Sequence, residues 1–215
     1  MLPTSPARIL DVGAGTGFLT LLAGELGHQV TAVDLSPGML GQLKAKAARA
    51  QLPVAVVEAD AMAVPPGPFD AVMSRHLLWT LPDPLAALRA WREAAPNGRL
   101  VLVESHWDNQ MSLPRLARQW SLWGLARARR TPPTHHAEYT PEVLAELPLG
   151  NGTNPERVLE LVVAAGWVAP RLRQLTDVNW AARKALPWPD RLLGEVPHYA
   201  VLADGRQTPN NPVPE

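Results

Sequence analysis

The sequence predicts an α/β fold, a doubly wound and mostly parallel sheet with helices on both faces, together with an inserted helical cap. Two observations carry this prediction. Short apolar runs rich in β-branched residues alternate with stretches of helical periodicity, which is the pattern of consecutive βαβ units. An apolar strand at residues 9–12 also runs directly into a glycine-rich turn that opens a helix. The 215 residues suffice for one such domain with a sizeable core and a cap.

The first half of the chain contains five predicted strands with helices between them. The strands cover residues 9–12, 29–34, 54–60, 69–73 and 99–104. The first helix follows the glycine turn, where leucines recur at helical spacing. The second helix has Ser36 as its N-cap and Pro37 at its first position, and it runs to about residue 49. A helix at 84–95 ends at an Asn-Gly turn.

The alternation stops over residues 105–149. Four apolar side chains there fit one helical face, namely Leu113, Leu116, Trp120 and Trp123. We therefore predict a cap over the carboxyl edge of the sheet. The alternation resumes with a helix at 155–165 and strands at 171–178 and 198–202. The predicted organisation is a ligand-binding half (1–104), the cap or substrate region (105–150), the remainder of the sheet domain (151–204) and a flexible tail (205–215).

Composition excludes several classes of function. Lys plus Arg equals Asp plus Glu, 20 of each, so the charge balance predicts no nucleic-acid partner. The N-terminus does not resemble a signal peptide and no apolar run is long enough to span a membrane, so we expect a cytoplasmic protein with no membrane partner. The chain has no cysteine, and the adjacent His135 and His136 lack an acidic cluster nearby, so no metal is expected.

The glycine turn discriminates between ligands through its spacing. Gly13, Gly15 and Gly17 allow a tight turn and a close approach of a ligand to the main chain. The helix N-terminus behind the turn would offer unpaired N–H groups to that ligand. A dinucleotide site reads G-x-G-x-x-G, which would require glycine where this chain has Phe18. A nicotinamide-dependent oxidoreductase is therefore disfavoured.

Two segments carry a family resemblance. The stretch from Asp11 to Gly17, DVGAGTG, resembles the first motif of class I S-adenosylmethionine-dependent methyltransferases. Residues 69–84, FDAVMSRHLLWTLPDP, resemble the fourth motif of the small-molecule type 11 branch, which includes ubiquinone- and menaquinone-biosynthesis methyltransferases. The matches span residues 9 to about 105, half of the chain. The resemblance implies a seven-stranded sheet, with the segments at 171–178 and 198–202 as an antiparallel edge hairpin.

The resemblance also implies an activity and a cofactor. We expect methyl transfer from S-adenosyl-L-methionine to a small-molecule acceptor, with S-adenosyl-L-homocysteine as product. The alternative is a protein that binds S-adenosylmethionine without turnover and needs a partner chain. Members of the family usually carry one or two helices before the first strand; a shorter lid, an upstream start or another chain could supply that cover. The sequence is also compatible with a homodimer.

The cofactor-binding residues follow from the same motifs. Asp34 ends the second strand, 19 residues after Gly15, and its carboxylate can accept both hydroxyl groups of a ribose. The resemblance assigns Asp60 and the Ala61 N–H to the adenine edge, although Asp60 could instead cap the short helix that follows. Leu35 and Met39 would flank the adenine. The methionine end would lie against Asp11, Gly13, Ala14, Gly15, Thr16, Gly17, Ser74 and Arg75.

The acceptor side is less well specified by the sequence. His76 follows the fourth strand and is the candidate base, with contact to the cofactor or a helix cap as the alternative. His106, Trp107 and Trp79 are candidate substrate contacts, and packing beneath the cap is the alternative for the first two. Carbon, oxygen and nitrogen all remain open as the accepting atom. Arsenic methylation of the usual kind is disfavoured because it relies on cysteines.

Overall fold

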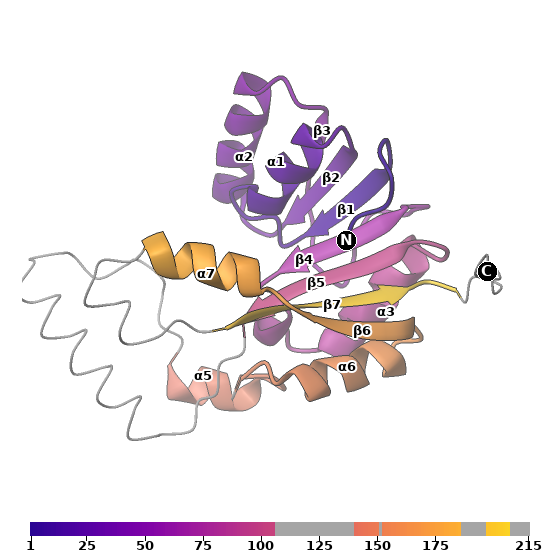
Figure 1. The fold of residues 1–215 in the computed structure, drawn as a ribbon, viewed down its shortest axis with the longest axis vertical. Coiled ribbons are helices and arrows are strands. Elements are labelled where there is room, and N and C mark those ends of the chain that lie inside the picture. Colours follow the sequence, from indigo (N-terminus) through magenta and orange to yellow (C-terminus); the bar gives the residue numbers. More distant parts are fainter. Residues whose placement is uncertain (106–139, 151, 186–196, 207–215) are drawn as a thin grey trace, which may run out of the picture.

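The computed structural model describes residues 1–105, 140–150, 152–185 and 197–206 (Figure 1). Most of the predicted cap lies outside these residues, including its apolar positions from Leu113 to Trp123. His106, Trp107 and the adjacent histidines also lie outside them, as does all but the start of the predicted tail.

One mixed sheet of seven strands forms the centre of the molecule (Figure 1). The strands are β1 (Arg8–Val12), β2 (Gln29–Asp34), β3 (Val54–Glu58), β4 (Ala71–Arg75), β5 (Arg99–Ser105), β6 (Val168–Gln174) and β7 (His198–Asp204). Their order is β3-β2-β1-β4-β5-β7-β6. The first five strands pair in parallel, whereas β7 runs antiparallel to both β5 and β6. The predicted doubly wound sheet with an antiparallel edge is confirmed.

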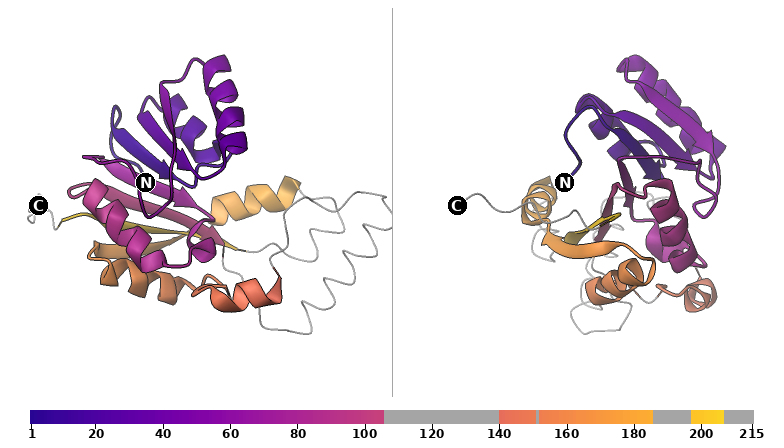
Figure 2. Two further views of the ribbon diagram at one scale, coloured as in Figure 1. Left: turned by 180° about the vertical axis from the view of Figure 1, so that it is seen from behind. Right: turned by 90° about the vertical axis from the view of Figure 1, so that its right-hand side faces the viewer.

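Helices cover both faces of the sheet, as the sequence predicted (Figure 2). The helices are α1 (Phe18–Glu25), α2 (Pro37–Arg49), α3 (Pro84–Ala94), α5 (Pro141–Glu146), α6 (Pro155–Ala164) and α7 (Thr176–Ala185), with a 3-10 turn η1 (Leu78–Thr80) after β4. Alternate strand residues separate the two layers. Ile9 and Met73 lie in the core beneath α1, while Leu10 and Val72 lie in the core beneath α3 and α6.

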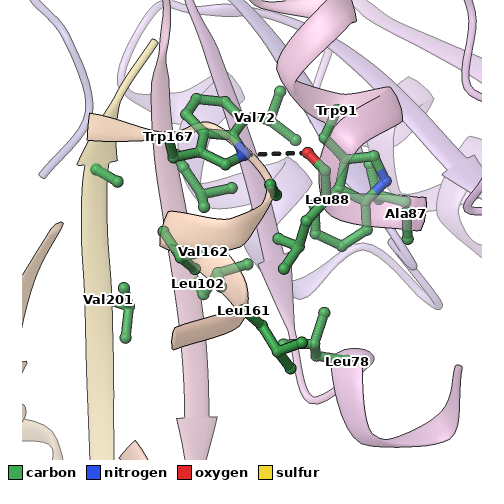
Figure 3. Close-up of a cluster of buried hydrophobic side chains, with 14 of the residues drawn as sticks. Val72, Leu78, Ala87, Leu88, Trp91, Leu102, Leu161, Val162, Trp167 and Val201 are labelled. Atoms are coloured by element: carbon green, nitrogen blue, oxygen red, sulfur yellow. Dashed lines mark hydrogen bonds between the residues drawn. The ribbon is translucent and has the colours of Figure 1, made fainter. Parts of the chain in front are cut away.

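Two buried tryptophans anchor the core beneath α3 and α6 (Figure 3). Trp91 in α3 and Trp167, just after α6, pack among apolar side chains that include Leu88, Leu161 and Val162. The indole Nε1 of Trp167 donates a 3.0 Å hydrogen bond to the carbonyl of Leu88. This bond ties the segment after α6 to α3, so the two helices are held together on one face.

The second half of the chain departs from the prediction at one element. Residues 171–178 were predicted as a strand, but β6 ends at Gln174 and α7 begins at Thr176. The prediction of strand for residues 176–178 is wrong. The helical turn is favoured there because Asn179 hydrogen-bonds to Leu175 through its main-chain N–H and to the N–H of His198 through its side chain. Periodicity over so short a run does not separate strand from helix.

Strand ends also shift slightly from the predicted bounds. β3 ends at Glu58, so Asp60 lies in the loop beyond the strand. β4 begins at Ala71 because Phe69 donates its N–H to Ala94 and Asp70 donates its N–H to Arg8, outside the ladder. At its other end β4 extends to Arg75, which places Ser74 and Arg75 within the strand at its carboxyl end.

Candidate functional site

The glycine turn after β1 is tied to the end of β2. The N–H groups of Gly13 and Ala14 both donate to the carbonyl of Val33, at 2.9 and 3.0 Å. The N–H of Gly15 donates to Oδ2 of Asp34 at 2.8 Å. These groups are engaged within the protein; the N–H groups that the sequence predicted for a ligand are those at the N-terminus of α1, which begins at Phe18. The turn fixes the position of the Asp34 carboxylate.

Glycine is required at two positions of this turn. Gly13 and Gly17 have φ of 69° and 92°, a conformation that residues with a Cβ rarely adopt. A Cβ at Gly13 would lie 2.8 Å from Cδ2 of Leu77, and one at Gly17 would lie 2.2 Å from Cδ1 of Leu43. The turn therefore packs closely against η1 on one side and against α2 on the other.

Asp34 accepts hydrogen bonds with both of its carboxylate oxygens. Oδ2 accepts from Gly15 and Oδ1 accepts from the N–H of Ser36, each at 2.8 Å. Ser36 in turn caps α2 by accepting from the N–H of Met39 at 3.3 Å. A carboxylate oxygen has two lone pairs, so each oxygen of Asp34 can accept one further hydrogen bond. The half-buried carboxylate is thus oriented and retains acceptor capacity for two hydroxyl groups.

A cavity of about 250 Å³ lies between Asp34 and the loop after β3. Its walls come from β1, β2, the loop after β3 and the segment after β4. The lining residues are Val12, Gly13, Val33, Asp34, Leu35, Ala59, Asp60, Ala61, Met62, Leu77, Thr80, Leu81 and Pro82. The structure therefore brings together five of the predicted residues, namely Gly13, Asp34, Leu35, Asp60 and Ala61. Met39 is not in the lining; its Sδ lies close to Gly15.

The segment after β4 forms the wall opposite Asp34. Sequence reasoning did not assign Leu77, Thr80, Leu81 or Pro82 to the site, although these residues belong to the fourth-motif segment. η1 folds this segment back toward the glycine turn, with the hydroxyl of Thr80 donating to the carbonyl of Leu77 at 2.7 Å. Trp79, a predicted substrate contact, is half-buried and packs against the main core.

The loop that carries Asp60 and Ala61 is held from two directions. Oδ1 of Asp60 accepts from the N–H of Met62 at 2.7 Å within a turn. The short helix that the sequence predicted Asp60 could cap is not formed between β3 and β4. The carbonyl of Ala61 accepts a 2.7 Å hydrogen bond from the buried indole of Trp91. Because the carbonyl of Ala61 is engaged, its N–H is the group of this residue that a ligand could use. Sequence reasoning did not identify Trp91 as a support of the site.

Asp11 is buried in β1 and faces the start of α1. Its Oδ2 accepts a 2.5 Å hydrogen bond from the hydroxyl of Thr20, and only 2 % of the residue is exposed. Burial raises the pKa of Asp11 to about 7, although hydrogen bonds from the hydroxyl and N–H of Thr20 and the charge of Arg75 oppose that rise. Gly17, the N-cap of α1, has no side chain for capping, so Asp11 supplies an acceptor there.

The two predicted residues at the end of β4 differ in what they can offer. Ser74 is fully buried and its hydroxyl donates to the carbonyl of Val12 at 2.8 Å, which joins β4 to β1. Arg75 is half-buried, and its guanidinium lies 4.4 Å from the centre of the Phe18 ring. Burial lowers the pKa of Arg75, and the charges of Asp11 and Glu104 oppose this shift. Arg75 is thus a cation with an aromatic platform beneath it.

His76 lies beyond Arg75 in an unusual backbone conformation. Its φ is 54°, which is uncommon for a residue with a side chain. Its N–H donates to the carbonyl of Val103 at 3.0 Å, and its Nδ1 lies 3.8 Å from Oε2 of Glu104. Glu104 is fully buried in β5 and sequence reasoning missed it. The sequence signal that could have identified Glu104 is its place directly after the apolar run Leu100–Val103.

Three further observations on the described residues concern metal ligands, membrane-spanning helices and a second cavity. In the described ranges, no group of three or more His, Asp or Glu side chains could hold a metal ion. None of the described helices is both long and apolar enough to cross a membrane. A second cavity of about 440 Å³ lies between α1, the N-terminal residues, β4 and β5, and none of the predicted site residues lines it.

Comparison with known proteins yields one matching family model, described as a methyltransferase domain, over residues 10–102. The ubiquinone biosynthesis O-methyltransferase of Xanthomonas campestris pv. campestris (strain B100) is 40 % identical over 100 residues, covering 45 % of this chain and 42 % of that protein. The protein of the same description from Xanthomonas euvesicatoria pv. vesicatoria (strain 85-10) is 30 % identical over 194 residues, covering 86 % of this chain and 79 % of that protein.

Solved structures share the fold at lower identity. A methyltransferase from Aquifex aeolicus, described as dependent on S-adenosylmethionine, has a TM-score of 0.60 and 17 % identity, covering 94 % of this chain and 84 % of that one. The chain spans about half the length, or less, of several curated relatives that it matches. The longer alignment to the Xanthomonas euvesicatoria protein extends the likeness beyond the first half of this chain.

Proposed function

The chain belongs to the family of S-adenosylmethionine-dependent methyltransferases, and we propose that it transfers a methyl group from that cofactor to a small-molecule acceptor. The cofactor would bind at the carboxyl ends of β1, β2 and β4, beside the glycine turn. Ligands of doubly wound sheets bind at this edge, where the strand order reverses next to the first strand. The observation that carries the proposal is the oriented Asp34 carboxylate at the wall of the 250 Å³ cavity.

The adenosine part fits the residues around that cavity. Asp34 would accept hydrogen bonds from the two ribose hydroxyl groups with its remaining lone pairs. The adenine would enter between Leu35 and the wall formed by Leu77 and Leu81, with Asp60 and the Ala61 N–H at its edge. The close contact of Gly13 with Leu77 supports this fit, because a side chain at Gly13 would intrude into the cavity.

The methionine part would lie toward the end of β4. Arg75 is the charged side chain there, and a guanidinium pairs well with a carboxylate. We assign Arg75 to the methionine carboxylate and the main chain of Ser74 and Arg75 to the same end of the cofactor. Asp11, in contrast, is buried against Thr20. It would fix the start of α1 and contribute its charge rather than a direct contact.

The cofactor supplies an electrophilic methyl group on a sulfonium, so the chemistry of activation belongs to it. The chain must bind both reactants, orient the accepting atom behind the methyl carbon and exclude water. Relatives described as O-methyltransferases of ubiquinone biosynthesis favour an acceptor oxygen on a small aromatic molecule. We propose this class of acceptor for the chain.

Calorimetry with S-adenosylhomocysteine tests the cofactor site. We expect binding to the wild type and a loss of more than about tenfold in affinity for Asp34→Ala, which corresponds to about 1.4 kcal/mol. Asp70→Ala is the matched control: Asp70 also accepts a main-chain N–H, from Arg8 at 2.7 Å, but at the opposite edge of the sheet. Its affinity should stay within about twofold. Unaltered binding by Asp34→Ala would overturn the assignment.

A further inference from the structure

Beside the proposed cofactor site, we propose an acceptor-side site in which Glu104 positions His76 as the base for an acidic hydroxyl group, such as that of a phenol. This inference rests on the proposed function, since it places a base next to the methyl donor. His76 would be the catalytic residue, and Glu104 a positioning residue that acts through it. Glu104 lies in β5 and His76 directly follows the neighbouring strand β4, both at the carboxyl edge of the sheet.

The first observation is the backbone of His76. A φ of 54° places it in the left-handed region, where the Cβ of an L-residue comes too close to its own backbone. The conformation is held by the hydrogen bond from its N–H to Val103 and by η1, which starts two residues later. Strained conformations of this kind gather at functional sites, where the surrounding structure imposes them. In this conformation Nδ1 of the imidazole lies 3.8 Å from Oε2 of Glu104.

The second observation is a buried carboxylate oxygen with no hydrogen bond. Oε1 of Glu104 accepts from the N–H of Leu78 at 3.3 Å, which caps η1. Oε2 is buried and has no hydrogen-bond partner among the described residues. Its nearest cation-forming neighbour is Nδ1 of His76, 3.8 Å away. A small rotation of the imidazole would close this distance to a hydrogen bond, and the cost of a buried unpaired carboxylate oxygen favours that closure.

The surroundings of Nδ1 determine which nitrogen carries the proton. Nδ1 faces Oε2 of Glu104 and, at 3.4 Å, the hydroxyl of Ser105. A carboxylate only accepts hydrogen bonds, so the proton of neutral His76 belongs on Nδ1. Nε2 then has a free lone pair. With 29 % of the His76 side chain exposed, that lone pair can meet a hydroxyl group of an incoming molecule.

The other groups facing this pair leave the role of base to His76. Tyr199 is paired with Glu104 across β5 and β7, but its hydroxyl donates to the carbonyl of Thr153 at 3.0 Å. Burial and the charge of Glu104 raise the pKa of Tyr199, which keeps it protonated. The His198 ring lies edge-on to His76, with centroids 5.4 Å apart, and Arg75 brings a positive charge from β4.

In the reaction that this site would support, the acceptor oxygen forms a bond to the methyl carbon while the carbon–sulfur bond breaks. The electron pair of the carbon–sulfur bond stays on sulfur. The hydroxyl proton passes to Nε2 of His76. A hydroxyl group needs this proton removed to become a strong nucleophile, whereas a neutral amine attacks with its own lone pair. The site therefore favours acceptors with an acidic hydroxyl group.

The test uses nitrogen-15 histidine spectra of the full chain saturated with S-adenosylhomocysteine. His76→Asn identifies the His76 signals, and asparagine tolerates the left-handed conformation. We expect neutral wild-type His76 to carry its proton on Nδ1, opposite to the Nε2 preference of a free histidine side chain. Glu104→Gln should shift it toward the Nε2 form, while Glu58→Gln, an exposed carboxylate on β3, should leave it unchanged. Added catechol, as the phenolic probe, should shift the Nε2 resonance.

Each outcome decides a separate point. A wild-type His76 protonated on Nε2 would overturn the positioning role, and this measurement stands even if Glu104→Gln fails to fold. A Nε2 resonance that catechol does not move would overturn the phenolic class of acceptor. Binding of S-adenosylhomocysteine is measured first in the same samples. Its absence would count against the proposed function, whereas its presence with the wrong tautomer would count against this inference alone.

Discussion

The indole Nε1 of Trp91 donates a 2.7 Å hydrogen bond to the carbonyl of Ala61, so α3 holds the loop that follows β3. Both residues are buried. The bond spans 30 positions of the chain and joins the core beneath α3 to the wall of the cavity. A core side chain is therefore a support of the proposed adenine site.

Trp91→Phe should weaken both stability and cofactor binding. Phenylalanine retains most of the apolar contact but leaves the buried Ala61 carbonyl without its donor, which costs about 1–3 kcal/mol. Affinity for S-adenosylhomocysteine should fall by about threefold or more because the loop is less constrained. Urea unfolding and calorimetry measure the two effects.

Trp167→Phe is the matched control for this prediction. It removes a similar bond of 3.0 Å to the carbonyl of Leu88, but that carbonyl lies within α3 and keeps its helical hydrogen bond. The loss of stability should be smaller than for Trp91→Phe, and affinity for the cofactor product should be unchanged. Equal losses of affinity in both variants would contradict a specific role for Trp91.

Arg75→Gln should discriminate between the two ends of the cofactor. S-adenosylhomocysteine carries a carboxylate that 5′-methylthioadenosine lacks, whereas both contain adenine and ribose. We expect Arg75→Gln to weaken binding of the former by about tenfold, the loss typical of a charged hydrogen bond, and to leave the latter unchanged. Asp34→Ala should weaken both ligands.

Arg99→Gln provides the control for the loss of an arginine. Arg99 also comes from a central strand, but it pairs with Asp204 at 3.1 Å at the opposite edge of the sheet. Its removal should change neither affinity. If calorimetry shows equal weakening of both ligands by Arg75→Gln, the carboxylate assignment is wrong.

Alanine substitutions at different glycines of the turn should destabilise the protein by different amounts. Gly17→Ala introduces a Cβ 2.2 Å from the buried Leu43, in addition to the strain of a positive φ. Gly15→Ala carries similar strain, but its nearest neighbour is Sδ of Met39 at 3.7 Å. Urea unfolding should show a loss of about 1–2 kcal/mol for Gly15→Ala and about 1–3 kcal/mol more for Gly17→Ala.

Gly41→Ala should change the free energy of unfolding in the opposite direction, toward greater stability. Gly41 lies in α2, is exposed, and has no atom within 4 Å of the added Cβ. Alanine there should stabilise the protein by about 0.5–1 kcal/mol, because it restricts the unfolded chain and favours the helix. A Gly17→Ala variant as stable as Gly15→Ala would show that Leu43 moves aside freely.

The pH dependence of stability should contain a contribution from Asp11. Its pKa is raised to about 7 in the folded protein, against about 3.9 for an unfolded aspartate. Between these values the folded state binds more protons than the unfolded state, so stability falls as the pH rises from about 4 to about 7. The slope approaches about 1.4 kcal/mol per pH unit for a single group.

Asp11→Asn should lack this contribution. The difference in free energy of unfolding between the wild type and Asp11→Asn should decline over the same interval and then level off above it. Thr20→Val removes the hydroxyl that favours the ionised form, so the decline should extend to higher pH. Parallel stability curves for all three proteins would show that Asp11 titrates as in the unfolded chain.

Most of the sheet was predictable because each of its strands is a local pattern. β1, β2 and the helices that follow them show clear periodicity and caps, such as Ser36 with Pro37 at the start of α2. Asp34 and the glycine turn were assigned to one cofactor site from their motif and spacing; the 2.8 Å hydrogen bond that joins them is seen only in the structure. α7 was missed because apolar residues recur from Leu172 through Leu175 to Val178, across the end of β6 and the start of α7. The bond between Asn179 and His198, residues distant in sequence, is part of what favours the helix.

The sequence by itself determined the fold, the family resemblance and the residues around the glycine turn, because these depend on local periodicity and on motif spacing. Only the tertiary structure decided which groups are already engaged. It placed Asp11 against Thr20, Trp91 against Ala61 and Glu104 beside His76, pairs that lie on separate elements. The physical reason is that burial and hydrogen-bond partners depend on packing between elements distant in sequence, which no local pattern records.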